Sequence, residues 1–323
     1  MTASSASPYA APAPLAARRR AWLTDLPLLL VAVFWGGSYL AAKGITTSHT
    51  VVAVLVLRFA LVVPVLVAAG WRGLRALTGA QWRGAALLGG ILAGIFLLET
   101  YGVVHTSATN AGLIISLTMI FTPLAEAAVT RTIPRALGSA QAGGTPISRG
   151  FLGAAALSVT GVVLLTQGAG FTAPSSGDVL ILLAAVARTA HVLAMARIKA
   201  VRSADSLSLT TVQLGTAVLV FAVLAAAGGG VTPWAAALEF GPREWAGLIF
   251  LSVFCTLFAF FVQMWAVRRT SPSRVSLLLG TEPLWAALAG VALAGDRPGV
   301  LGLAGAVLVL GGTAWGRRGA DAQ

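Results

Sequence analysis

Long apolar stretches separated by short polar gaps occupy most of this chain of 323 residues. Ten of them reach about 17 to 25 residues, the length that a helix needs to cross a bilayer. Apolar runs of this length are typical of helices surrounded by lipid. We therefore predict an all-α integral membrane protein with ten transmembrane helices, whose approximate limits are 26–43, 51–70, 84–104, 111–130, 150–167, 178–197, 208–228, 246–267, 275–294 and 299–316.

Basic residues alternate between the gaps. Seventeen of the 22 Lys and Arg residues lie before the first stretch, in every second gap or after the last stretch, whereas the intervening gaps hold only Lys43, Arg243 and Arg297. Basic connections of membrane proteins stay in the cytoplasm. We therefore expect both termini in the cytoplasm of a multi-pass protein of a bacterial inner membrane. Arg58 and Arg188 are left inside apolar stretches.

An internal repeat divides the chain into two copies, at about 25–168 and 174–318. Residues 32–41 align with 185–194, and three further short motifs recur in the same order. Each copy holds five spans. Because five is an odd number, the second copy has the opposite orientation in the membrane. Inverted repeats are common in secondary transporters. The preceding segment 1–24 is rich in Ala, Pro and Ser, and we expect a disordered cytoplasmic tail there.

The composition excludes a water-soluble protein. Hydrophobic residues make up 57% of the chain and charged residues 10%, and the mean hydropathy is +0.88. Soluble domains carry about 25% charged residues. The net charge of +12 is dispersed over short gaps, which argues against nucleic-acid binding. Cys255 is the sole cysteine, so neither a disulfide framework nor a thiolate metal cluster is expected, and no motif indicates a metal or another cofactor.

Several short motifs support a family resemblance. They are Trp35-Gly36-Gly37-Ser38, Arg58-Phe59, Thr106-Ser107-Ala108-Thr109-Asn110-Ala111-Gly112 leading into Phe121-Thr122-Pro123, and Glu282-Pro283-Leu284 closing with Gly295-Asp296-Arg297. On these motifs the chain resembles the EamA family of the drug/metabolite transporter superfamily over roughly residues 25–318. The resemblance implies ten helices, cytoplasmic termini, and export or uptake of small metabolites such as amino acids. One departure concerns Arg188, which stands where this family often has tryptophan.

Two charges lie in the outer halves of their spans. At about 1.5 Å per residue, Arg58 lies about 10 Å from the outer end of its span and Glu99 about 7 Å from the outer end of its own. Charges inside spans are costly and therefore suspected of function. At matching depth, Arg58 and Glu99 can also pair as a static outer brace, and we predict that pairing.

Arg188 and Glu282 lie nearer the midplane and are the predicted substrate-binding residues. Arg188 would bind a substrate carboxylate bidentately, while Glu282 would take an ammonium group or carry a proton. The alternative is a fixed ion pair between them. His191 lies one turn after Arg188 and is either a proton relay or a packed, hydrogen-bonded side chain. Pro283 predicts a kink beside Glu282.

Aromatic and small residues suggest two further features. Trp35 and Tyr39 share a helix face, and they either stack on a substrate or pack against a neighbouring helix. Gly90-x-x-x-Gly94 predicts a close crossing of two helices.

The sequence therefore favours a secondary transporter that exports small metabolites, such as amino acids or drug-like amphipathic compounds, by alternating access. Its partners would be the solute and the lipid bilayer, with protons as a candidate coupling ion; a homodimer stays open. A passive facilitator or channel is the alternative. An intramembrane enzyme is disfavoured, because the chain has no metalloprotease His-Glu-x-x-His or phosphate-binding Gly-x-x-x-x-Gly-Lys motif.

The orientation of the spans can be tested by cysteine labelling. In a Cys255→Ala background, we expect Ser48→Cys to react with a membrane-impermeant maleimide on intact cells, whereas Ser203→Cys reacts only after permeabilisation. Reaction at both positions on intact cells would contradict the predicted topology.

Overall fold

A computed structural model describes residues 15–132, 149–166, 174–228, 230–267, 269, 275 and 278–321. The secondary structure of these residues is helical. The helices are α1 (Leu15–Ile45), α2 (Val51–Ala76), α3 (Gly79–His105), α4 (Ala108–Ile115), α5 (Thr118–Thr132), α6 (Arg149–Thr166), α7 (Ser176–Arg197), α8 (Lys199–Arg202), α9 (Ser206–Ala227), α10 (Pro233–Glu239), α11 (Pro242–Ile249), the π-helix η2 (Phe250–Phe258), α12 (Ala259–Val267), α14 (Glu282–Ala292) and α15 (Gly299–Asp321).

Eight helical segments of the described chain are long and apolar enough to cross a membrane, which confirms a multi-span, all-helical protein. The predicted span 150–167 corresponds to the shorter apolar helix Arg149–Leu165. The predicted span 275–294 corresponds to α14 and to residues that lie partly outside the described chain. The count of ten spans therefore stays a prediction.

The first helix begins earlier than the sequence predicts. Residues 15–24, which the sequence predicts to be part of a disordered tail, are the first part of α1, while residues 1–14 of that tail lie outside the described residues.

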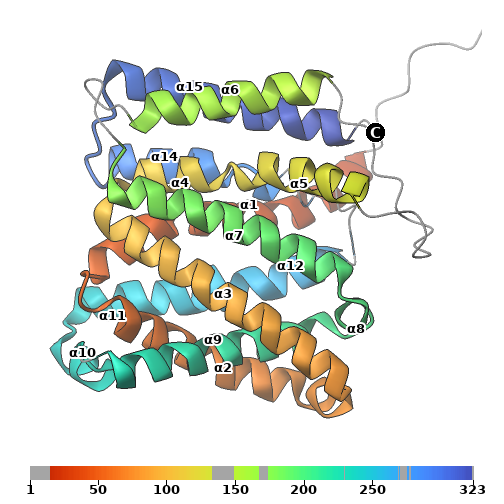
Figure 1. The fold of residues 1–323 in the computed structure, drawn as a ribbon, viewed down its shortest axis with the longest axis vertical. Helices are drawn as coiled ribbons and strands as arrows, with labels where there is room; N and C mark the ends of the chain where they lie inside the picture. The colour runs from red at the N-terminus through yellow and green to blue at the C-terminus, as the bar shows by residue number, and fades with distance from the viewer. Residues whose placement is uncertain are drawn as a thin grey trace, which may run out of the picture.

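The long helices run side by side along one direction (Figure 1). At one side of the bundle α6 packs against α15, and next to them α14 lies between α1 and α4. At the other side α9 contacts both α2 and α3, and α3 also packs along α7. We call the end of the bundle with the connections 77–78 and 198–205 the basic end, and the end with the connections 46–50 and 106–107 the opposite end.

Side-chain caps set the first residue of several helices. Thr78 accepts a hydrogen bond from the backbone N–H of Gln81, and the Gln81 side chain accepts from the Thr78 N–H. Ser175 and Asp178 form the same reciprocal box at the start of α7. Such caps satisfy backbone N–H groups that have no partner inside the helix.

Three spans depart from a regular α-helix near their middle. A turn at 116–117 separates α4 from α5. The span from Pro242 continues as α11, then as η2, then as α12. Glu282 starts α14, and Pro283 lies in the first turn of that helix, where its missing N–H costs nothing. The predicted kink at Pro283 is thus a helix start.

Glycines allow close approach at three helix crossings. A Cβ at Gly36 would lie 2.6 Å from the backbone N of Ala286, and one at Gly89 would lie 2.6 Å from the Gln213 carbonyl oxygen. A Cβ at Gly161 would lie 2.7 Å from the Val309 N. The helix backbones therefore touch at these positions.

The predicted close crossing at Gly90-x-x-x-Gly94 is wrong. A Cβ at either glycine would meet nothing within 4 Å, and Gly90 is exposed. The α3–α9 contact is made one residue earlier, through Gly89. A glycine spacing shows that a helix can be approached closely but does not specify the face that the neighbour uses.

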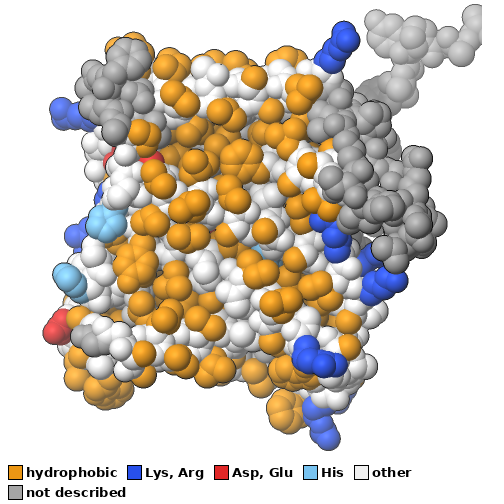
Figure 2. Space-filling model, in the orientation of Figure 1, with side chains coloured by type: hydrophobic (Ala, Val, Ile, Leu, Met, Phe, Trp, Pro, Cys, Tyr) orange, Lys and Arg blue, Asp and Glu red, His pale blue; other side chains and the backbone are white. Residues whose placement is uncertain are grey.

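Apolar side chains cover the middle of the surface. Figure 2 shows them across the centre of one face, with Lys and Arg side chains gathered along the edge that corresponds to the basic end. Large apolar side chains are exposed in this region, for example Leu87 (62% exposed), Leu219 (64%) and Leu303 (60%). A band of exposed apolar residues between polar ends is the surface of a lipid-embedded bundle.

The α6–α15 crossing provides a stability test. We expect Gly161→Ala to lower the free energy of unfolding by about 1–3 kcal/mol, because the added methyl group overpacks against the Val309 backbone. Gly311→Ala is the matched control on α15, since that glycine is exposed and a Cβ there meets nothing within 4 Å. Thermal unfolding in detergent measures both, and equal melting temperatures for the two variants would contradict the packing.

Candidate functional site

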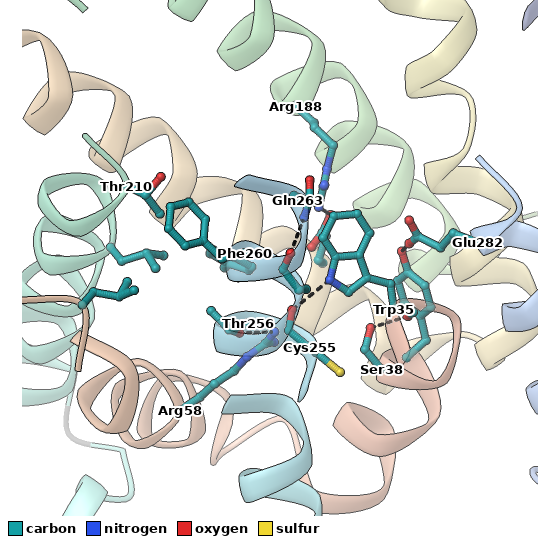
Figure 3. Close-up of a pocket in the computed structure, with 16 residues that line it drawn as sticks. Trp35, Ser38, Arg58, Arg188, Thr210, Cys255, Thr256, Phe260, Gln263 and Glu282 are labelled. Carbon is teal, nitrogen blue, oxygen red and sulfur yellow. Dashed lines mark hydrogen bonds and ion pairs between the residues drawn. The ribbon is translucent and has the colours of Figure 1, made fainter. Parts of the chain in front are cut away.

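A cavity of about 220 Å³ lies between the central helices (Figure 3). Four of its lining side chains are Arg or Glu, and the others are polar, aromatic or aliphatic. The lining residues are Trp35, Ser38, Tyr39, Arg58, Leu66, Phe96, Glu99, Arg188, Thr210, Leu214, Cys255, Thr256, Ala259, Phe260, Gln263 and Glu282.

The lining residues lie at different distances from the ends of their helices. Thr210 and Gln263 each lie four residues from the basic-end terminus of their helix, about 6 Å along the axis. Toward the opposite end the lining stops at Tyr39 and Glu99, six residues or about 9 Å from the ends of α1 and α3.

Apolar packing and polar contacts close the opposite end. Ile45, Val54 and Leu248 belong to one buried apolar cluster near the ends of α1, α2 and α11. Lys43 of α1 donates a hydrogen bond to the Thr106 carbonyl oxygen.

Two carboxylates at the opposite end hold the start of α4. The Thr106 hydroxyl donates to Asp178 Oδ1 at 2.5 Å, and the Asn110 amide donates to the same oxygen at 3.1 Å. Asp296 accepts from the N–H and the hydroxyl of Thr109 at 2.9 and 2.8 Å. The residues of the Thr106–Gly112 motif therefore tie α4 to α7 and to the segment after α14.

Arg188 and Glu99 form an ion pair across the cavity wall, between α7 and α3. The Arg188 side chain is 40% exposed and that of Glu99 is 13% exposed. The predicted brace between Arg58 and Glu99 is wrong, because the Glu99 carboxylate accepts from Arg188 instead. Depth along each helix suggested the first pairing, but the rotation of α3 and its packing along α7 determine the second.

Glu282 accepts a hydrogen bond from the Tyr39 hydroxyl at 2.8 Å. This contact joins the start of α14 to α1, and Tyr39 is buried. The alternative of a fixed ion pair between Arg188 and Glu282 is therefore wrong. The two predicted substrate-binding residues line one cavity but have separate partners.

Arg58 lies against aromatic rings. Its guanidinium carbon lies 5.0 Å from the centre of the Phe59 ring and 5.6 Å from that of Phe96. Its Nη2 donates to the Thr256 hydroxyl at a long 3.4 Å. Within the described chain Arg58 has no ion pair, and its buried Nε has no hydrogen-bond acceptor.

The π-helix η2 brings polar groups to the cavity. Trp35 Nε1 donates to the Cys255 carbonyl oxygen at 2.8 Å, and the Thr256 hydroxyl donates to the Leu251 carbonyl oxygen. Figure 3 shows Trp35 near the centre of the cavity, with Arg58, Arg188 and Glu282 approaching from different sides. Wider turns of this kind are often found at functional sites.

His191 is not among the residues that line the cavity. Its Nε2 lies 2.9 Å from Gln213 Oε1 of α9, so it bridges α7 and α9. This contact fits the packed, hydrogen-bonded alternative for His191.

Sequence reasoning missed Ser38, Thr210, Thr256 and Gln263 as lining residues. Hydroxyl side chains are common in transmembrane helices, where they bond to the preceding turn, so Ser and Thr carry little signal. Gln263 could have been recognised from the sequence, because an amide inside an apolar stretch needs a polar environment.

The fold and the cavity define a multi-pass membrane protein with an internal polar site. Residues 22–138 and 175–315 match the EamA-like transporter family, and the chain therefore belongs to this family of membrane transporters. It is also similar to an uncharacterized transporter of Archaeoglobus fulgidus, with 25% identity over 299 residues that cover 90% of this chain and 95% of the relative.

A crystal structure of a protein with 18% sequence identity has a similar fold. The superposition has a TM-score of 0.59 and covers 91% of this chain and 96% of the other. At this identity, the similarity extends to the fold alone.

The Arg188–Glu99 pair can be tested by charge removal. We expect Glu99→Gln to destabilise the protein by about 1–3 kcal/mol, less than the cost of breaking a fully buried pair, because Arg188 is partly exposed. Adding Arg188→Gln should restore part of this loss, since no unpaired charge remains. Thermal unfolding of the two single variants and the double variant measures the coupling; simply additive losses would contradict the pair.

Proposed function

We propose that the chain is a secondary transporter built from two inverted repeats of five spans, with both termini in the cytoplasm. The family matches twice, once in each half, which supports a duplication. Equivalent spans of the two copies also make equivalent helix contacts. The first span α1 packs against α14 of the ninth span, and the sixth span α7 packs against α4 and α5 of the fourth.

Alternating access is the mechanism that the cavity supports best. Its lining extends toward the basic end, which the positive-inside rule places in the cytoplasm, while Lys43, Thr106 and the Ile45 cluster close the other end. We take this arrangement as a cytoplasm-facing conformation. Transport would require the opposite end to open and the basic end to close around the same site.

The solute is a small amphipathic metabolite, such as an amino acid or a drug-like compound, and the direction is export. The lining of the cavity supports an amphipathic solute most directly, because it combines Arg and Glu side chains with Trp35, Phe96 and Phe260. Charged groups would orient a polar end of the solute and the rings would contact its apolar part. The cytoplasm-facing cavity would load from inside the cell.

Glu282 is the proposed proton-carrying group. Its carboxylate lines the cavity and has a neutral partner, Tyr39, so a proton or a cationic group of the solute can neutralise it. The predicted role of Arg188 in carboxylate binding competes with the ion pair to Glu99.

Export of a metabolite can be tested in two stages. Cells that overexpress the protein are screened for resistance to toxic metabolites and analogues, which names a solute class and a direction. Labelled solute is then followed into inside-out vesicles. We expect an imposed pH gradient to drive accumulation, and Glu282→Gln to reduce the initial rate by at least about tenfold, since contacts to charged groups contribute about 1.5–3 kcal/mol.

Glu239→Gln, on exposed α10, is the matched control and should transport normally. Equilibration of the solute without any response to the pH gradient would support the passive facilitator instead. Normal transport by Glu282→Gln would contradict the role of Glu282.

A further inference from the structure

The four charged side chains of the cavity differ in how they are neutralised. Arg188 and Glu99 form an ion pair. Glu282 accepts from the Tyr39 hydroxyl. Arg58 contacts the Thr256 hydroxyl and two rings, and it has no ion pair among the described residues. We infer that Arg58, rather than Arg188, binds an anionic group of the transported solute, an assignment that rests on the proposed transport function.

The surroundings hold the Arg58 guanidinium in place without neutralising it. Phe59 is fully buried and, with Phe96, lies against the guanidinium. Rings stabilise a cation but accept no conventional hydrogen bond. The Ser252 hydroxyl donates to the Arg58 carbonyl oxygen at 3.0 Å and ties this turn of α2 to η2. The guanidinium is thus positioned before a ligand arrives.

Arg58 also has unused hydrogen-bonding capacity. A guanidinium carries five N–H donors, and the contact to Thr256 occupies one of them at 3.4 Å. The Nε group is buried and without an acceptor in the described chain. A buried donor without a partner costs about 1–3 kcal/mol, and more when it is charged. An anionic group that accepts from the free donors of the guanidinium would reduce this cost.

Arg188 is a weaker candidate for the same role. Glu99 already neutralises its charge, so an anionic ligand would meet a pair with no net charge. Its unpaired Nε can still donate a hydrogen bond, which aids the positioning of a ligand without attracting its charge. Charge selection would therefore come from Arg58, whose neighbours Phe96 and Thr256 also line the cavity.

The shape of the lining indicates how the ligand lies. Leu66, Phe96 and Leu214 line the cavity and pack in one apolar cluster with Phe59, the residue after Arg58, whereas Glu282 lies at the start of α14. An anionic group at Arg58 would thus be combined with an apolar body along these side chains. The negative charge of Glu282 would be balanced by a cationic group of the solute or by a proton.

Binding of three probes of the same size tests the assignment. The full-length protein is reconstituted in nanodiscs, and titration calorimetry compares 3-phenylpropionate, 3-phenylpropan-1-ol and 3-phenylpropylamine. The alcohol corrects for partition into lipid. We expect the wild type to bind the acid more tightly than the alcohol, and Arg58→Gln to weaken acid binding by at least about tenfold, as expected for a lost charge-assisted contact.

Arg58→Lys keeps the charge without the planar fork and should lose part of this affinity. Arg197→Gln removes an exposed cation at the basic end of α7 and serves as the matched control. In Glu99→Gln/Arg188→Gln the preference for acid over alcohol should persist, since Arg58 remains.

A measurement on the wild type avoids dependence on the folding of a variant. Phenylglyoxal modifies accessible guanidinium groups, and mass spectrometry locates the modified arginines. We expect 3-phenylpropionate, but not the alcohol, to protect Arg58 from modification.

Three results would overturn the assignment. They are equal binding of acid and alcohol by the wild type, unchanged acid binding by Arg58→Gln, and loss of acid preference in the Glu99→Gln/Arg188→Gln variant with no protection of Arg58. Failure of the transport function would be distinct, because acid binding at Arg58 would persist while vesicles showed no transport of the solute from the screen.

Discussion

The high cost of a charge between apolar helices determines much of this structure. A side chain such as Glu99, 13% exposed and flanked by apolar helices, needs a counter-charge or a polar partner nearby. Arg188 meets that need and thereby connects α3 to α7, while the Tyr39–Glu282 contact connects α1 to α14. The same contacts place charged atoms at the centre of the bundle and leave a polar cavity between them.

Interrupted helices make such a site possible. A regular helix uses its backbone groups internally, so it offers a cavity only side chains. The π-helix η2 presents the Cys255 carbonyl oxygen to Trp35, and α14 starts at Glu282 inside the bundle. Close glycine-mediated packing elsewhere, as between α6 and α15, brings the backbones of neighbouring helices into contact.

Much of the candidate site could be predicted, but its pairing could not. Trp35, Tyr39, Arg58, Glu99, Arg188 and Glu282 all line the cavity, because charged and amphipathic residues stand out in apolar stretches. The partner of Glu99 was misassigned, since depth along a helix leaves its rotation undetermined. The undetermined rotation of α3 also explains why the close approach occurs at Gly89 and not at Gly90 and Gly94.

The sequence by itself determined that the protein lies in a membrane, because the free energy of transferring an apolar run into lipid depends on composition and length alone. It likewise indicated which polar residues to suspect and which connections carry the positive charge. Only the tertiary structure decided that Arg188 is neutralised by Glu99 while Arg58 faces rings and a hydroxyl. Such pairings depend on how each helix is rotated against its neighbours, and that rotation follows from side-chain packing across the whole bundle.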